Sequence, residues 1–130
     1  MGRQSGENRE WSLKNLRALA SEGKERGLAL VVGTCGKQTG SFVWDLPTLA
    51  AYIKDTDREN ILAAVTLPEL AEAGLDIPGC VELFGGKLGH VYLADRGGKI
   101  PGSTGEEMEG YLRALEAANF SGFVSVQISF

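Results

Sequence analysis

Residues 88–130 read LGHVYLADRGGKIPGSTGEEMEGYLRALEAANFSGFVSVQISF and decide the fold of this chain. The short apolar, branched runs at 91–94 and 123–128 predict two strands. Between them, Thr104 and Glu107 form a T-x-x-E capping box, which indicates the start of a helix. The apolar face of this helix comprises Met108, Tyr111, Leu112 and Leu115. The stretch therefore predicts two parallel strands joined by a crossover helix.

The same alternation continues upstream of this stretch. Apolar runs at 28–32 and 61–65 predict two more strands, so that successive strands are about thirty residues apart, the size of a βαβ unit. Predicted helices cover residues 12–26, 47–54, 68–73 and 77–84, with start signals at Asp45 and Thr66 and stop signals at Gly27, Gly74 and Gly85. Alternating strands and helices favour an α/β fold with a parallel sheet over a β-sandwich.

Length and composition limit the class of protein. The chain has 130 residues, which is about half of the roughly 250 that a complete (β/α)8 barrel needs. Hydrophobic residues make up 43% and the formal net charge is −4, so a buried core is expected and a nucleic-acid partner is not. We expect a polar N-terminal segment over residues 1–11 and one half-barrel domain over residues 12–130.

The sequence also indicates a cytoplasmic protein. No apolar run approaches the roughly 20 residues that cross a bilayer, and residues 1–10 lack the apolar core of a signal peptide, so we expect no membrane partner. Cys35 and Cys80 are isolated, which argues against a disulfide framework and against zinc held by cysteines.

Four parallel strands cannot close on themselves, so both edges of the sheet and one apolar face need a cover. An open, flavodoxin-like sheet with helices on both faces is one solution. The other is a homodimer in which strand 28–32 of one chain lies beside strand 123–128 of a second copy, closing eight strands. In such a ring, the first helix of each chain would cover the last strand of the other.

Residues 89–96 (GHVYLADR), the turn Pro101-Gly102 and residues 124–128 (VSVQI) resemble the xylose isomerase-like TIM barrels. These are sugar and sugar-phosphate isomerases and epimerases related to endonuclease IV, and the similarity is to their C-terminal half. The resemblance extends over about residues 12–130 and is strongest in the last forty. It implies a (βα)4 half-barrel. In that family, two glutamates, an aspartate and a histidine at the strand ends hold a divalent metal ion.

Carried over to this chain, the four metal-ligand positions are Gly33, Thr66, Tyr92 and Gln127. None offers the anionic oxygen or imidazole that such an ion prefers, so we expect no metal and no other cofactor. Where the family places a substrate-contacting histidine, this chain has Glu69.

Strand periodicity predicts which residues point into the barrel. Alternate residues of a strand face opposite sides, so Val124, Val126 and Ile128 would face helices and Ser125, Gln127 and Ser129 would face inward. His90, Tyr92 and Ala94 would likewise share one face. The inward polar row is either a hydrogen-bonded plug or a ligand pocket, and both readings stay open.

Single reactive residues do not by themselves indicate an enzyme. His90 is a candidate general base, but a packed, hydrogen-bonded interior histidine is favoured. Cys35 follows a strand without a neighbouring histidine, which favours a passive thiol. The glycine-rich stretches 33–40 and 97–105 lack the P-loop pattern, and loop geometry explains them better than phosphate binding.

The function that the sequence favours is a scaffold. We expect an engineered or degenerate half-barrel from a sugar isomerase or epimerase, silent toward isomerisation, forming a homodimer with a small-molecule ligand at the barrel mouth. The pocket candidates are Gly33, Thr66, Glu69, His90, Tyr92, Arg96 and Gln127. The alternative is a metal-dependent isomerase or epimerase with displaced ligands such as Glu69 and Asp95.

Overall fold

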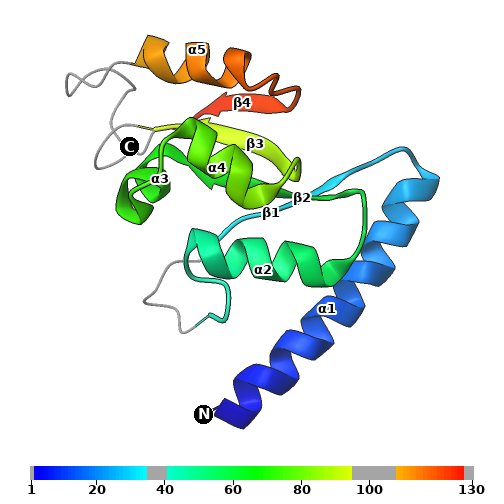
Figure 1. Cartoon of the computed structure of the whole chain (residues 1–130). Helices are drawn as coiled ribbons and strands as arrows, with labels where there is room; N and C mark the ends of the chain where they lie inside the picture. The colour runs from blue at the N-terminus through cyan, green and yellow to red at the C-terminus, as the bar shows by residue number, and fades with distance from the viewer. Residues whose placement is uncertain (1, 35–40, 95–107, 128–130) are drawn as a thin grey trace. The chain divides into compact units, whose positions relative to one another are not determined.

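The computed structural model describes residues 2–34, 41–94 and 108–127, with side chains from residue 8 onward (Figure 1). Its elements alternate between helix and strand as the sequence predicts. In chain order they are α1 (Gly2–Glu25), β1 (Leu30–Val32), α2 (Leu46–Thr56), β2 (Ile61–Thr66), α3 (Leu67–Ala73), α4 (Ile77–Phe84), β3 (Leu88–Leu93), α5 (Met108–Ala117) and β4 (Phe123–Val126). Thr104, Glu107, Ile128 and Ser129 lie outside the described residues.

The four strands form one sheet in the order β1-β2-β3-β4. β1 pairs parallel with β2, and β3 pairs parallel with β4, with Tyr92 opposite Ser125. Sequential order is the pattern of a TIM barrel, whereas a doubly wound, flavodoxin-like sheet reverses its order at a switch point. The flavodoxin-like alternative is therefore wrong for the described strands.

The chain divides within β2 into two compact units, residues 1–63 and 64–130. In the first unit, α1 packs against α2, and Leu13 and Ala20 of α1 are fully buried. The Arg17 guanidinium donates hydrogen bonds to the backbone oxygens of Asp55 and Thr56 at the end of α2. Arg9 forms a salt bridge with the Asp55 carboxylate at 2.7 Å. These contacts attach α1 to the unit between Arg9 and Ala20.

The start of α1 corrects one expectation from the sequence. The helix was predicted to begin at residue 12, but it begins at Gly2. Of the residues just before Trp11, Asn8 and Glu10 are exposed and Arg9 is held by Asp55. Polarity alone therefore did not mark a helix boundary. The division of the chain into a segment 1–11 and a domain 12–130 stays a prediction.

Each of the next three helices begins with a side-chain cap. Asp45 and Thr48 form a reciprocal capping box at α2, Thr66 caps α3, and Asp76 caps α4. Gly74 caps the C-terminus of α3 and Gly85 that of α4, both with positive φ, as glycine permits. The predicted starts of α2 and α3 and both bounds of α4 are confirmed.

The second unit has its core between β2, β3, α3 and α4. Val65, Val91, Leu70, Ile77 and Cys80 are buried there. β4 differs from this pattern, because Val124 and Val126 are 40% and 61% exposed. No helix of the described residues covers these two valines in the single chain, and their orientation toward helices of an assembled barrel stays a prediction. Among residues 2–34, 41–94 and 108–127, no helix has the length and apolarity needed to cross a bilayer.

Candidate functional site

The polar side chains of β3 and β4 meet on one face of the sheet. Residues of β3 alternate between half-buried and buried, so that His90 and Tyr92 share a face opposite Val91 and Leu93, as predicted. The Nε2 atom of His90 lies 2.7 Å from the Oγ atom of Ser125 on β4. The predicted inward row of polar residues therefore includes at least one direct hydrogen bond between neighbouring strands.

Aromatic rings surround the His90 imidazole. The Tyr92 ring stacks on it with centroids 4.4 Å apart and planes 8° from parallel. The Phe123 ring lies 6.3 Å away at 40°. The imidazole is thus held by ring contacts and by Ser125, and the expectation of a packed, hydrogen-bonded histidine is supported.

Thr66 and Glu69 interact at the end of β2. The Thr66 hydroxyl accepts a hydrogen bond from the Glu69 backbone N–H and donates one to the Glu69 carboxylate at 3.1 Å. This is the N-cap of α3, so both side chains have a structural role there. The hydroxyl at this family ligand position is already engaged.

The remaining pocket candidates are placed as follows. Gln127 follows β4 with its side chain exposed, and its backbone N–H donates to the Leu93 oxygen at 2.9 Å. Gly33 follows β1 in the first unit and is exposed. Arg96 lies outside the described residues, as do Asp95 and Cys35. The second unit thus brings His90 and Tyr92 together, and Thr66 with Glu69.

The chemistry of these positions does not suit a hard divalent cation. Thr66, Tyr92 and Gln127 are neutral, and Gly33 has no side chain. Mg²⁺ and Mn²⁺ prefer carboxylate oxygens, with imidazole as a further ligand for Mn²⁺. Among the residues that the structure describes, no group of three or more His, Cys, Asp or Glu side chains is arranged around a common point.

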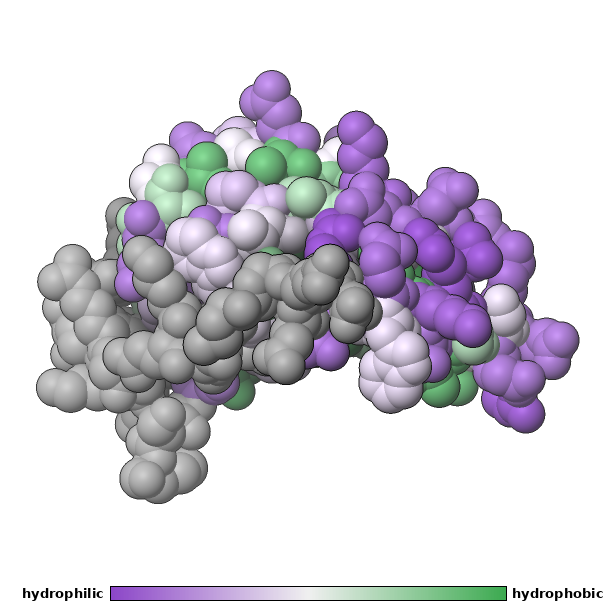
Figure 2. All heavy atoms as spheres, turned by 90° about the horizontal axis from the view of Figure 1, so that it is seen from below, coloured by the Kyte–Doolittle hydropathy of each residue, from purple (hydrophilic) through white to green (hydrophobic). Residues whose placement is uncertain are grey.

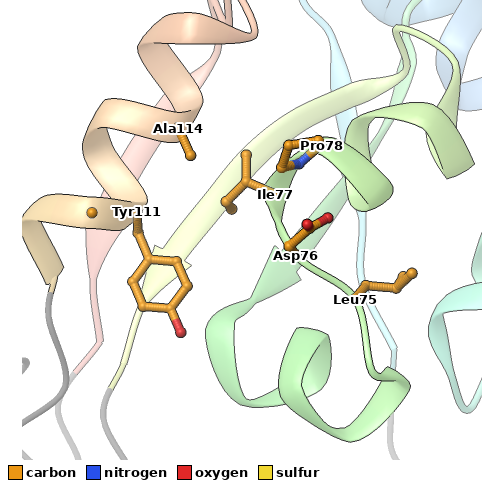
Figure 3. Close-up of a pocket in the computed structure, with 7 residues that line it drawn as sticks. Leu75, Asp76, Ile77, Pro78, Tyr111 and Ala114 are labelled. Carbon is orange, nitrogen blue, oxygen red and sulfur yellow. The ribbon is translucent and has the colours of Figure 1, made fainter.

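A pocket that the sequence did not indicate lies between α4 and α5 (Figure 3). It has a volume of about 560 Å³, and its lining residues are Leu75, Asp76, Ile77, Pro78, Gly110, Tyr111 and Ala114. Figure 3 shows the Asp76 carboxylate directed away from Tyr111, and one of its oxygens accepts from the Gly79 N–H. The pocket is thus lined by both polar and apolar surface. No motif marks it, because it arises from how two helices pack.

The sequence also did not predict the hydrogen bond between His90 and Ser125. The two residues are 35 positions apart in sequence, and only the register of β3 and β4 brings them together. Strand periodicity predicted that both point to the same side. It could not predict that they are bonded, because a shift in register would separate them.

The fold is half of a TIM barrel, as comparison with solved structures shows. The chain superposes on D-psicose 3-epimerase from Clostridium cellulolyticum H10, crystallised with D-tagatose, with a TM-score of 0.78 and 17% identity over 94% of this chain and 42% of that one. For the 3-keto-D-glucoside 4-epimerase YcjR from E. coli, the TM-score is 0.77 with 19% identity over 94% and 47%. For AP endonuclease, family 2, from Brucella melitensis, it is 0.78 with 21% identity over 92% and 48%.

The chain therefore spans less than half the length of each of these structures. The family resemblance read from residues 88–130 is confirmed at the level of the fold. At these identities the similarity shows the fold alone. No protein-family model and no curated protein matches the sequence.

Proposed function

We propose that this chain is a cytoplasmic half-barrel scaffold that closes into an eight-stranded TIM barrel by pairing with a second copy. In this proposal it is an engineered or degenerate relative of the sugar isomerases and epimerases, and it does not catalyse their isomerisation. The proposal rests on one observation. The described sheet has four strands in sequential order, and its edge strands, β1 and β4, each pair with only one other strand.

Strand number supports a second copy as the partner. A closed barrel of this kind has eight strands, and each strand has two neighbours. In the described sheet, β1 and β4 have one neighbour each. A second copy adds four strands, and β1 of each chain then lies beside β4 of the other around a two-fold axis.

Exposed apolar side chains support the same partner. On α1, Trp11 and Leu19 are 70% and 60% exposed, and on β4 Val124 and Val126 are uncovered. On the face that Figure 2 draws, apolar side chains reach the surface between polar ones. In a single chain, the apolar face of α1 therefore has no strand packed against it, and the apolar face of β4 has no helix packed against it. Two copies satisfy both, because α1 of each can cover β4 of the other.

The loss of isomerase activity rests on the residues at the barrel mouth. The family needs a metal ion there, and Gly33, Thr66, Tyr92 and Gln127 are poor ligands for it. The Thr66 hydroxyl is also engaged in the α3 cap. We propose that the mouth binds a small neutral or anionic molecule, near Tyr92, Gln127, Thr66 and Arg96, in place of a metal complex.

The solution mass tests the assembly. Light scattering at increasing concentration should give about twice the 13.9 kDa of one chain. Val126→Lys places a charge on the uncovered β4 face and should shift the protein to monomer. Glu72→Ala, on the exposed surface of α3, is the matched control and should leave the mass unchanged. A wild-type protein that stays monomeric at every concentration would exclude the dimeric barrel.

A metal titration tests the alternative activity. Thermal unfolding is followed with Mn²⁺ or Mg²⁺ and again after EDTA. We expect no change, because the mouth positions lack anionic ligands. A rise in melting temperature that EDTA reverses, and that Glu69→Gln abolishes, would instead favour a metal-dependent isomerase with displaced ligands.

A further inference from the structure

Ser125 and His90 form a pair that the scaffold function does not use. They lie on adjacent parallel strands, with Ser125 Oγ and His90 Nε2 2.7 Å apart. A hydroxyl within hydrogen-bond distance of an imidazole nitrogen is the arrangement in which histidine acts as a general base toward serine. Both side chains are half-buried, so they are partly shielded from water and still reachable.

The surroundings fix the orientation of the imidazole. In the well-known triads a carboxylate holds the histidine, whereas here the ring is stacked against Tyr92 and flanked by Phe123. The strands themselves approach closely, since a Cβ atom at Gly122 would lie 2.2 Å from the Gly89 backbone oxygen. Ring stacking and tight strand pairing thus hold the two reactive atoms at their observed separation.

The pair is also reachable from solvent, because His90 and Ser125 are only half-buried. Ser125 is one residue from the carboxyl end of β4, the end at which TIM barrels place their active sites. A small, flat molecule could therefore approach Ser125 from the barrel mouth.

We propose that Ser125 and His90 act as a nucleophile and general base toward small activated carboxylic esters, such as aryl acetates. Ser125 Oγ attacks the ester carbonyl carbon while its proton passes to His90 Nε2. The bond from the acyl carbon to the aryl oxygen breaks, and the phenol leaves with that proton. Water then attacks the acyl-serine with His90 as base, releasing acetic acid and restoring the Ser125 hydroxyl.

Hydrolysis of p-nitrophenyl acetate by the whole 130-residue chain tests the proposal. Ser125→Ala and His90→Gln should each lower the rate above background about 100-fold, the typical contribution of a general base. Ser121→Ala, an exposed serine just before β4, is the matched control and should keep the wild-type rate. Ser125→Cys should keep acyl transfer, because a thiol replaces the hydroxyl.

Mass spectrometry of the quenched reaction gives a second readout that does not depend on any variant. The peptide that contains Ser125 should gain one acetyl group during turnover. Two results would overturn the proposal. If Ser125→Ala hydrolyses the ester at the wild-type rate while His90→Gln does not, the imidazole acts alone. If the wild-type rate equals that of free imidazole at the same concentration and no acetyl group is found, the hydrogen bond is purely structural.

Discussion

Short-range contacts determine what individual polar residues of the second unit do. The Thr66 hydroxyl and the Glu69 carboxylate, both candidates for ligand binding, are bonded to each other and to the start of α3. His90 is bonded to Ser125. Among the described residues, every buried side-chain nitrogen or oxygen atom has a hydrogen-bond partner. Because an unsatisfied buried polar group costs roughly 1–3 kcal/mol, such pairing contributes to stability even where it carries no chemistry.

Cys80 gives a prediction for pH dependence. It is fully buried on α4, and burial, with a smaller effect of the Glu69 carboxylate, raises the pKa of its thiol from 9.0 to about 11. The folded protein therefore keeps this proton where the unfolded chain loses it. The thiol's contribution to stability is complete below pH 9 and disappears as the pH rises through 11. We expect a loss on the order of 2–3 kcal/mol.

The measurement is the free energy of unfolding in urea from pH 8 to pH 11, for wild type and Cys80→Ala. Other groups titrate in both proteins, so only the difference between the two curves reports on the thiol. That difference should become smaller as the pH rises. If it stays constant across this range, the pKa of the buried thiol is not raised.

At the scale of the elements, helix starts depend on local capping residues, whereas strand pairing depends on contacts between distant segments. The caps at Asp45, Thr66 and Asp76 begin α2, α3 and α4, and each is visible as a polar residue before Leu-Pro or Ile-Pro. These elements could be predicted because a cap acts within four residues of sequence. The β3–β4 pairing could not be predicted in the same detail, because its register depends on contacts between residues more than thirty positions apart.

Gly122 tests the β3–β4 pairing. An alanine Cβ there would lie 2.2 Å from the backbone oxygen of Gly89, so one strand must move. We expect Gly122→Ala to lower the free energy of unfolding by about 1–3 kcal/mol, the usual cost of overpacking. Urea unfolding monitored by circular dichroism measures it. Ser121→Ala is the control and should change stability by less than about 0.5 kcal/mol. Equal stabilities of the two variants would contradict the close approach.

The whole molecule is best understood as an incomplete α/β layer. A TIM barrel has a continuous ring of strands inside a ring of helices. The described chain has four of those strands in sequence, with Val124, Val126 and Phe123 uncovered on the last one. Apolar side chains on an edge strand favour association. Pairing gives the backbone N–H and C=O groups of that strand hydrogen-bond partners and removes apolar surface from water.

Trp11 can report directly on the proposed dimer. In Trp44→Phe protein it is the only remaining tryptophan. Trp11 is 70% exposed in the single chain, and we expect it to become buried against β4 of the second copy. Its emission maximum should move to shorter wavelength, and acrylamide should quench it less, over the same concentration range in which the mass doubles.

Trp11→Phe, which leaves only Trp44, is the control and should show a smaller change. A doubled mass with unchanged Trp11 emission would mean that the chains associate without α1 covering β4. Such a result would require a different interface, while dimer formation itself would stand.

The sequence by itself determined the alternation of helices and strands, the caps at Asp45 and Thr66 and the class of fold, because those depend on periodicity and on polar residues within one turn of a helix. It also predicted that His90 and Tyr92 share a face. Only the tertiary structure decided the β3–β4 register, the His90–Ser125 bond, the engagement of Thr66 with Glu69 and the exposure of Val124 and Val126. These features depend on which distant segments lie side by side, and local sequence patterns do not encode that.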